Sequence, residues 1–572
     1  MIKVISRNNR YAFFCISKTK KTLKPMNNAI FKYDLPKNEP VLSYLPCSPE
    51  REALEKEIKR LSSSVMDIPL IIGGKEVRTG KLGKVVMPHN HSHVLAQYHI
   101  AGEEETQMAI EAALKAHEYW SQVSWVERLS ITLKVAELIS KKYRATLNAA
   151  TMLGQGKNVY QAEIDAACET IDFLRFNAHY ISEIYNQQPI SETGTINRLE
   201  YRPLEGFVFT VSPFNFTAIA SNLNMAPVLM GNTVVWKPAS TALLSNYILM
   251  QIYKEAGVPD GVINFIPGKG SAIGNVVFNH PMLAGIHFTG STATFNTFWK
   301  AVSNNLAKYR SYPKLVGETG GKDFIFVHPS ANINQAVIAA VRGAFEYQGQ
   351  KCSAASRAYI PESLWPEFKK NILGIMHEIN MGDPTDYETF VNAVIDEASF
   401  DNIMSYIEKA KQSDAAEIIA GGKGDKSKGY FVEPTIIVTT DPHFVTIEEE
   451  IFGPVLTIYV YPDEKFEETL ELCDKTSPYA LTGAIFSSDR QALNKACRVL
   501  RYSAGNFYFN DKPTGAVVGQ QPFGGARASG TNDKAGGPFN LIRWTSPRTI
   551  KENLNPPIDY RYPYMTNARC GE

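Results

Sequence analysis

The chain has 572 residues and a formal net charge of +1, with 59 Lys and Arg against 58 Asp and Glu. This balance provides no excess positive charge for binding nucleic acid or an anionic membrane. Hydrophobic residues make up 44% of the chain, but no run of about 18 apolar residues occurs, which indicates a globular protein of several domains without a membrane span. The seven widely spaced cysteines argue against a disulfide framework and indicate a reducing compartment.

The first 35 residues differ in charge from the rest of the chain. No acidic residue precedes Asp34, whereas lysines and arginines are interspersed with apolar residues such as Phe13 and Ile16. A basic, acid-poor and mildly amphipathic N-terminus is typical of a mitochondrial presequence. We interpret residues 1–35 as a presequence that directs the protein to the mitochondrial matrix; the alternative is a basic tail without a targeting role.

Helices and then a parallel sheet are predicted next. Ser48 caps a helix, and apolar residues at helical spacing predict a helical region from Glu103 to Thr151. From Gly206, short β-rich runs are each followed by a turn rich in Gly, Pro or Ser and by a stretch of helical length. The runs are Phe207–Val211, Thr233–Trp236, Val262–Ile266 and Gly285–Phe288. This alternation predicts parallel strands whose loops meet at one edge, where open α/β sheets bind ligands.

A second α/β pattern begins near Lys314. Its apolar runs, again separated by helical stretches, are Phe324–Val327, Ala358–Ile360, Val455–Val460 and Leu481–Phe486. A second layered domain is the simplest explanation of this pattern.

Three residues are candidates for catalysis. Cys352 precedes small residues and follows the basic Lys351, so its thiol can lie exposed at a turn and act as a nucleophile. Glu318, among glycines, becomes a base near neutral pH if it is buried. The amide of Asn215, at a strand end, can donate to an oxyanion. Each has an ordinary alternative: a small buried cysteine, a solvated glutamate and an asparagine bonded to its own turn.

Other segments could bind phosphate, ribose or a metal. Gly268 opens a loop that is one residue off the dinucleotide-binding spacing, whereas Ser291 begins a helix and offers a better anion site. Lys237, after a strand, can reach ribose hydroxyls or phosphate, or else lie on the surface. The three histidines of segment 89–93 lack acidic or cysteine partners and are interpreted as a polar loop, so no metal is expected.

In combination and order, these motifs resemble the NAD(P)-dependent aldehyde dehydrogenase superfamily. The resemblance covers roughly Ile68 to Asn553. The matching segments are Pro213–Phe216, Trp236–Ala239, Phe288–Ser291, Glu318–Lys322, Gly349–Cys352 and Glu449–Pro454.

The resemblance implies an α/β fold of three parts and an oligomer. A Rossmann-like NAD-binding domain would span 36–314 and an α/β catalytic domain 315–510. Residues 511–572 would carry a substrate-anchoring loop, return to the NAD-binding domain and end in an oligomerisation segment. A β-hairpin flap at about 190–205, to which Thr195–Pro203 corresponds, would pair with another subunit and form a homodimer or a larger homo-oligomer.

The resemblance also implies a reaction. Cys352 would attack an aldehyde carbon, its backbone N–H and the Asn215 amide would hold the oxyanion, hydride would pass to NAD, and Glu318 would activate the water that hydrolyses the thioester. The residues implied to contact NAD are Lys237, Ser240, Gly268, Ser291, Glu450 and Phe452. Because a neutral serine at position 240 does not repel a 2′-phosphate, the choice of NAD over NADP stays open.

Within the superfamily, the chain is similar to the branch that oxidises glutamate γ-semialdehyde. The similarity lies in Ser212–Ala218, Cys352–Ala354 and Thr514–Asn532. It implies that the substrate carboxylate meets the Ser353 hydroxyl and the backbone N–H groups of Gly515 and Ala516. The other residues implied to contact this small-molecule substrate are Phe216 and Phe523, which flank its aliphatic part, and Glu169, near its ammonium group.

Three alternatives remain open on the sequence. A semialdehyde dehydrogenase with another acid substrate would use the same chemistry. A thiol hydrolase would use Cys352 and Glu318 without hydride transfer. A non-catalytic protein could retain the fold alone, although Cys352, Glu318 and Asn215 together argue against it.

Overall fold

The computed structural model describes residues 31–565. The presequence predicted for residues 1–35 therefore lies almost wholly outside the described residues. Within the described part, no helix is both long and apolar enough to cross a membrane.

The first of two seven-stranded sheets has the strand order β11-β10-β7-β8-β9-β2-β3. The strands from β11 to β9 are parallel, and β2 and β3 extend the sheet in antiparallel fashion. Their bounds are β2 (Leu70–Ile72), β3 (Lys75–Val77), β7 (Phe207–Val211), β8 (Thr233–Lys237), β9 (Ile263–Phe265), β10 (Leu283–Thr289) and β11 (Lys314–Glu318). The four strands predicted in this region are confirmed.

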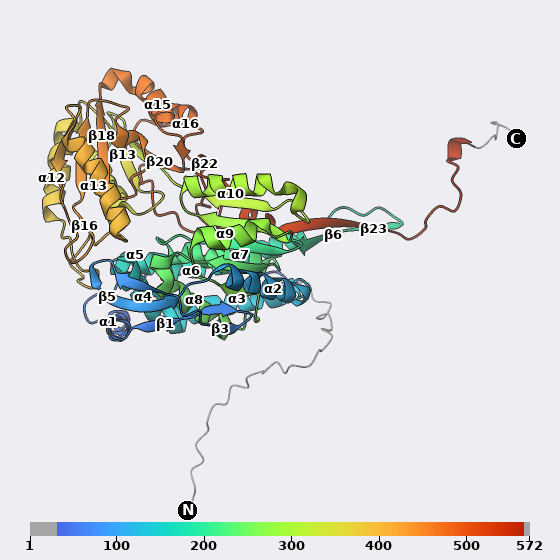
Figure 1. Cartoon of the computed structure of the whole chain (residues 1–572). Helices are drawn as coiled ribbons and strands as arrows, with labels where there is room; N and C mark the ends of the chain where they lie inside the picture. Colours follow the sequence, from blue (N-terminus) through green and yellow to red (C-terminus); the bar gives the residue numbers. More distant parts are fainter. Residues whose placement is uncertain (1–30, 566–572) are drawn as a thin grey trace, which may run out of the picture. The chain divides into compact units, whose positions relative to one another are not determined.

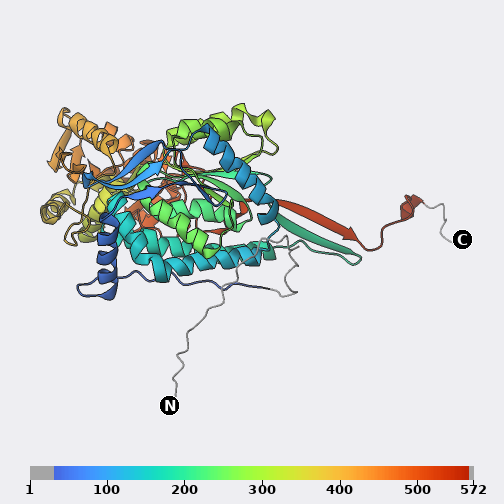
Figure 2. The same ribbon diagram turned by 60° about the horizontal axis from the view of Figure 1, so that its bottom comes forward.

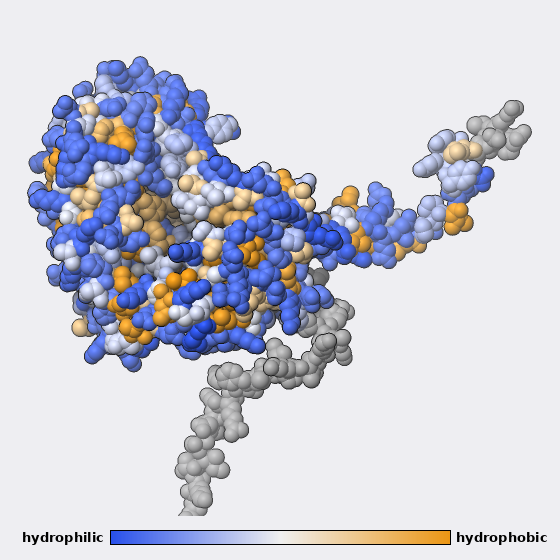
Figure 3. Space-filling view, viewed as in Figure 1, coloured by the Kyte–Doolittle hydropathy of each residue, from blue (hydrophilic) through white to orange (hydrophobic). Residues whose placement is uncertain are grey.

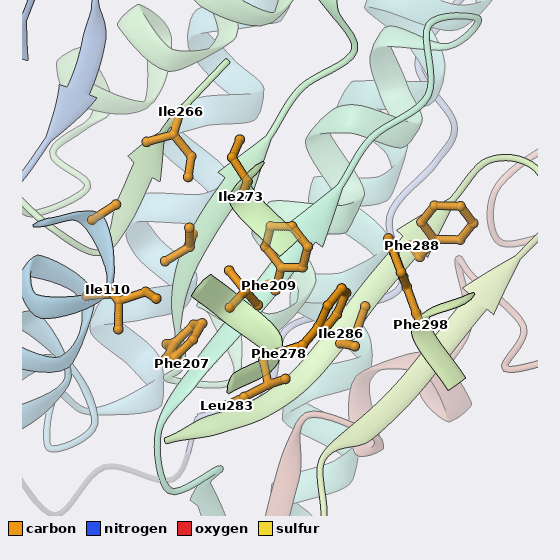
Figure 4. Close-up of a cluster of buried hydrophobic side chains, with 14 of the residues drawn as sticks. Ile110, Phe207, Phe209, Ile266, Ile273, Phe278, Leu283, Ile286, Phe288 and Phe298 are labelled. Carbon is orange, nitrogen blue, oxygen red and sulfur yellow. The ribbon is translucent and has the colours of Figure 1, made fainter. Parts of the chain in front are cut away.

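Helices cover both faces of the first sheet. Phe207 and Phe209 point to one face, where they pack with Phe278 and Phe298 (Figure 4); each such buried side chain contributes about 1.5–3 kcal/mol. Thr210 points to the opposite face, since side chains alternate along a strand, and bonds Asn224 at 2.6 Å. The first face is covered by α2 (Glu103–Trp120), α9 (Gly270–Asn279) and α10 (Thr292–Asn304). In Figures 1 and 2 the yellow-green α9 and α10 lie apart from the cyan helices of the other face.

The helices of the opposite face form a layered bundle behind α7 (Thr217–Leu229). The remaining bundle helices are α3 (Trp125–Leu138), α4 (Arg144–Gln155), α6 (Thr170–Asn186) and α8 (Leu243–Ala256). A π-helical segment, η2 (Glu163–Glu169), joins the short α5 (Val159–Ala162) to α6. Such π segments recur at functional sites. Before the bundle, α1 (Pro49–Ser62) begins at the predicted cap, where the Ser48 side chain accepts from the Arg51 N–H.

The second seven-stranded sheet has the order β14-β17-β18-β13-β12-β20-β21 and is parallel except for β14. Its strands are β12 (Asp323–Val327), β13 (Ala355–Pro361), β14 (Ala416–Ala420), β17 (Thr435–Thr439), β18 (Val455–Tyr461), β20 (Thr482–Phe486) and β21 (Asn506–Phe509). The helices packed on it are α11 (Ile333–Phe345), α12 (Trp365–Glu378), α13 (Glu397–Lys411), α15 (Phe466–Lys475) and α16 (Arg490–Val499). The four strands predicted in this region, at β12, β13, β18 and β20, are confirmed.

The strand Lys314–Glu318 corrects the predicted start of the second pattern. As β11, it pairs in parallel with β10, from Gly285 opposite Lys314 to Thr289 opposite Glu318, and so completes the first sheet. The second sheet begins only with β12 at Asp323. Glu318 therefore stands where the chain leaves one sheet for the other. The division into domains at 314, 510 and 572 stays a proposal.

The strand predicted to form a β-hairpin flap at about 190–205 has a different partner from the one that a hairpin implies. The strand β6 (Thr195–Pro203) pairs along its whole length with β23 (Thr545–Asn553), so the ribbon joins segments far apart in sequence rather than two consecutive strands. Figure 1 shows this ribbon extending beyond the helices of the first sheet. Local sequence could not reveal the pairing, because either strand alone shows only alternating polarity.

Candidate active site

Cys352 lies at a turn between a 3-10 helix, η5 (Glu346–Gly349), and β13. Shortly before that turn, Tyr347 and Gln348 have positive φ values of 52° and 57°. The Gln348 amide holds this backbone by donating to the carbonyls of Gly156 (2.8 Å) and Ala393 (2.9 Å). A strained but anchored loop therefore carries Cys352, a residue of intermediate exposure whose thiol is buried.

Cys352 and Glu318 line one cavity of about 410 Å³. The residues predicted to bind substrate line the same cavity: Glu169, Phe216, Ser353, Gly515, Ala516 and Phe523. These residues are far apart in the sequence, and the fold places them around one cavity. The cavity is of a size that suits a small molecule.

Glu318 has the environment of a general base. Its Oε1 atom is buried without a hydrogen-bond partner among the described residues. Burial raises the pKa of Glu318 to about 7, against the opposing charge of Lys534. Lys534 also lines the cavity and is held by the carbonyls of Gly505 (2.7 Å) and Gly524 (3.1 Å). A carboxyl group with this pKa can accept a proton near neutral pH.

The Cys352 thiol is protonated at neutral pH in this state. Burial raises its pKa well above the usual value, and the nearby Glu318 carboxyl raises it further. Lys351, predicted beside the thiol, instead forms a buried ion pair, in which its ammonium donates to Glu346 Oε2 at 3.0 Å. The thiol therefore has to lose its proton before it can react as a nucleophile.

Asn215 lies beside residues 346–352, the segment that ends at Cys352. It follows β7, and its Nδ2 atom donates to the carbonyl of Gln350 at 3.0 Å, two residues before Cys352. The next element, α7, begins at Thr217 and is capped by Asp165, which accepts from the N–H groups of Thr217 (3.0 Å) and Ala218 (2.8 Å). The cap fixes the backbone that carries Asn215, although Asn215 itself does not line the cavity.

Sequence reasoning missed a buried ion pair that supports this loop. Lys157 donates to Asp165 Oδ2 at 2.7 Å, and both side chains are fully buried. The Lys157 ammonium also lies 3.9 Å from the centre of the Phe216 ring and 4.5 Å from that of Tyr347. The pair thus links the segment of Asn215 and Phe216 to residues 346–352, which include Cys352. No local sequence pattern predicts this ion pair, because a lysine between two helices is ordinarily a surface residue.

The side of the cavity assigned to the substrate carboxylate is built from short polar contacts. Ser353 Oγ lies 2.8 Å from Thr514 Oγ1. Gly515 has a φ of 93°, a conformation that favours glycine. Lys512 donates to the Thr514 carbonyl at 2.8 Å and so holds the backbone immediately before Gly515.

Glu169, at the end of η2, places a carboxyl group on the helical side of this cavity. Burial raises the pKa of Glu169 well above its usual value, the Asp165 charge adds to this, and Lys157 opposes it. An incoming ammonium group would offset the cost of ionising Glu169, which fits the predicted role.

The residues predicted to contact NAD lie elsewhere than in this cavity. Lys237 ends β8, and Gly268 and Ser291 follow β9 and β10, at the edge where parallel sheets bind nucleotides. Ser240 begins a 3-10 turn, η3 (Ser240–Ala242), after the same strand as Lys237, and Ser291 caps α10 by accepting from the Thr294 N–H. The strand ends thus carry four of the six residues.

The other two residues predicted to contact NAD, Glu450 and Phe452, lie just before β18 of the second sheet. Glu450 accepts from the Gly321 N–H at 2.9 Å, and burial raises the pKa of Glu450 to about 7 against that hydrogen bond. Phe452 has a φ of 58° and packs edge-on against Phe214, with ring centres 5.8 Å apart.

Two observations show that these residues fit a dinucleotide. Burial lowers the pKa of Lys237, and its ammonium has no hydrogen-bond or ion-pair partner within residues 31–565. A Cβ atom at Gly268 would lie 2.8 Å from the Ala101 carbonyl, so only glycine allows this close approach. An unpaired cation and a tight glycine turn at a strand edge suit hydroxyl and phosphate groups.

The histidines of segment 89–93 do not gather around a common point. His89 Nε2 lies 3.6 Å from Asp383, whereas His91 Nε2 contacts the Lys426 carbonyl at 3.0 Å. Over residues 31–565, no group of three or more His, Cys, Asp or Glu side chains is arranged to hold a metal ion.

The comparisons agree on one family. Residues 77–550 match the aldehyde dehydrogenase family. The chain belongs to the aldehyde dehydrogenase family. A Dictyostelium discoideum protein named mitochondrial delta-1-pyrroline-5-carboxylate dehydrogenase is 55% identical over 533 residues, which cover 93% of this chain and 96% of that protein. The human protein of the same name is 52% identical over 92% of this chain and 94% of its own length.

Solved aldehyde dehydrogenase structures share the fold. The delta-pyrroline-5-carboxylate dehydrogenase of Mycobacterium tuberculosis bound with NAD has a TM-score of 0.91 and 49% identity, over 94% of this chain and all of the other. A 1-pyrroline-5-carboxylate dehydrogenase from Thermus with bound NAD has a TM-score of 0.85 and 32% identity, over 91% of this chain and all of the other. The predicted family and its α/β fold are thereby confirmed.

Proposed function

We propose that this chain oxidises L-glutamate γ-semialdehyde, formed from Δ1-pyrroline-5-carboxylate, to L-glutamate with NAD, a step of proline catabolism. The observation that carries the proposal is that Cys352 and Glu318 line one cavity together with Ser353, Gly515 and Ala516. The names of the relatives, at about half sequence identity over most of the chain, support the same substrate, and the NAD-bound neighbours support the cofactor.

In the first half-reaction, Cys352 Sγ forms a bond to the aldehyde carbon after its proton moves to a base. The oxyanion that results is held by the Cys352 N–H and by the Asn215 amide, which has to turn from its contact with the Gln350 carbonyl toward the thiol to do so. NAD, when bound, supplies the acceptor for the hydride that leaves the same carbon. The substrate is then a thioester on Cys352.

In the second half-reaction, Glu318 takes a proton from water, which attacks the thioester carbon. Cys352 Sγ leaves and regains a proton, and the acid is released. The pKa of Glu318, raised by burial to about 7, lets its carboxylate act as a base at neutral and mildly alkaline pH.

One comparison of substrates tests the function. The full chain is incubated with NAD and, separately, with pyrroline-5-carboxylate, acetaldehyde and succinic semialdehyde, and NADH formation is followed. A clear preference in kcat/KM for pyrroline-5-carboxylate is expected. A preference for succinic semialdehyde would favour the alternative semialdehyde dehydrogenase. No NADH formation from any of the three aldehydes, together with hydrolysis of a simple ester, would favour a thiol hydrolase.

Ser353→Ala tests the carboxylate contact. A hydrogen bond to a charged group contributes about 1.5–3 kcal/mol, so kcat/KM for glutamate semialdehyde should fall about 10- to 150-fold. A short neutral aldehyde has no carboxylate and should be much less affected. Equal losses on both substrates would mean that Ser353 only packs beside Cys352.

We also propose the mitochondrial matrix as the location. The basic, acid-poor segment 1–35 supports it, and several relatives carry the word mitochondrial in their names. A soluble reporter fused to residues 1–40 should enter the mitochondrial matrix, as protease protection after rupture of the outer membrane would show. A reporter that stays in the cytosol would contradict the proposal.

We further propose that the chain forms a homodimer or a larger homo-oligomer through the β6–β23 ribbon. Beyond β23, the described chain exposes apolar side chains, visible in Figure 3 along the extended segment. They include Leu554 and Ile558, which are 60% and 104% exposed, and Tyr560. Exposed apolar side chains in a contiguous segment favour burial against another protein surface.

A further inference from the structure

One wall of the substrate cavity comes from a segment before α1, the first helix among residues 31–565. Asn38, Glu39 and Val41 line the cavity together with the loop after Thr514. We call residues 38–44 the N-terminal arm and residues 514–521 the anchor loop. Neither the thiol chemistry nor the predicted cofactor contacts involve the arm, so its place in this wall needs another explanation.

The arm is fixed to the helical bundle along its length. The Glu39 carboxylate accepts from Arg144 at 2.6 Å and from Arg175 at 2.5 Å. The Leu42 N–H and the Tyr44 hydroxyl donate to the two oxygens of buried Glu163 at 2.9 and 2.8 Å. A segment tied down at this many points can transmit a fixed position to whatever it contacts.

Asn38 uses its whole amide to join the anchor loop to α6. Its Nδ2 atom donates to Asp172 Oδ2 on α6 and to the Val518 carbonyl in the anchor loop, both at 2.8 Å. Its Oδ1 atom accepts from Gln520 Nε2 at 2.9 Å. The second Asp172 oxygen accepts from the Glu39 N–H at 2.7 Å.

The two elements that Asn38 joins are the two sides of the proposed head-group site. The anchor loop carries the N–H groups of Gly515 and Ala516, which would meet a carboxylate. Glu169, which would meet an ammonium group, lies one helical turn before Asp172. A zwitterionic amino-acid head group needs both at a set separation, whereas a neutral aldehyde needs neither.

We propose that Asn38 is a positioning residue that sets the separation between the anchor loop and α6, and thereby the selectivity of the cavity for aldehydes with an amino-acid head group. This inference rests on the proposed function, because the head group is that of glutamate semialdehyde. Asn38 acts through the loop and the helix and touches none of the reacting atoms.

The test measures KM and kcat of the full chain for glutamate semialdehyde and for propanal. Asn38→Ala should raise KM for glutamate semialdehyde by about 10- to 100-fold, since it releases both sides of the head-group site. kcat, and kcat/KM for propanal, should stay within about threefold of the unsubstituted chain. The matched control is Lys37→Ala, an exposed neighbour, which should leave KM unchanged.

A second variant approaches the same contact from the loop. Gln520→Ala removes one hydrogen bond from an exposed side chain and should raise the same KM by a smaller factor. In the double variant the two effects should be less than additive, because both act through one contact. If Asn38→Ala does not fold, Gln520→Ala alone decides, and an unchanged KM would overturn the proposal.

The two levels of inference fail differently. If the unsubstituted chain does not prefer glutamate semialdehyde over propanal, the proposed function is wrong. If it does prefer it, and Asn38→Ala alters both substrates equally or neither, only the positioning role is wrong.

Discussion

Cys352→Ala should lower kcat for aldehyde oxidation by at least about 10⁴-fold, because it removes the atom that bonds to the substrate carbon. Alanine fits the turn, since the residues after it are already Ser353 and Ala354. The measurement is NADH formation at saturating substrate, together with the dissociation constant for NAD. NAD binding should persist, because the predicted cofactor contacts lie outside the Cys352 cavity.

Two other cysteines, Cys473 and Cys497, provide controls for this variant. Cys473 is buried in the second sheet's core, and burial raises the pKa of its thiol to about 11. Cys497 is exposed on α16, outside the cavity, so Cys497→Ala should retain full activity. Substantial turnover by Cys352→Ala would mean that another group attacks the aldehyde. Mass spectrometry of the enzyme stopped during turnover should place the acyl group on the peptide that contains Cys352.

The sheets could be predicted from sequence because their signal is local. The runs Phe207–Val211 and Phe324–Val327 are rich in β-branched and aromatic residues and bounded by turn residues, and the structure has strands at or near those bounds. Which strands pair is not a local property. The assignment of Lys314–Glu318 to the first sheet and the pairing of β6 with β23 depend on contacts between segments far apart in sequence.

The same distinction applies to the site. Cys352 and Glu318 stand in short motifs that the family resemblance identifies in combination, and the role predicted for Ser353 comes from the same resemblance. Asn38 and Lys157 stand in no such motif, because each acquires its role only from distant partners: Asn38 from the anchor loop, and Lys157 from the Phe216 and Tyr347 rings. An asparagine in an irregular segment and a lysine between helices carry no such signal by themselves.

Glu318→Gln should separate the two half-reactions. The amide cannot take a proton from water, so the thioester should form and persist, and NADH should appear as one burst per active site. Steady-state turnover should fall by about 10²–10⁴-fold, the usual contribution of a general base. The variant also removes a negative charge that raises the pKa of Cys352, so the pKa of that thiol should fall and the burst should not be lost.

The pH dependence gives an independent check on the same residue. The active form of Glu318 is the carboxylate, and burial raises its pKa to about 7, so hydrolysis should be slow below pH 7 and rise to a plateau above it. The rate of thioester hydrolysis, followed after rapid mixing from pH 5.5 to 9, gives this profile directly; the range brackets that pKa by about 1.5–2 units. In Glu318→Gln the rise centred near pH 7 should disappear. A variant that kept both the wild-type rate and the rise would show that water is activated by another group.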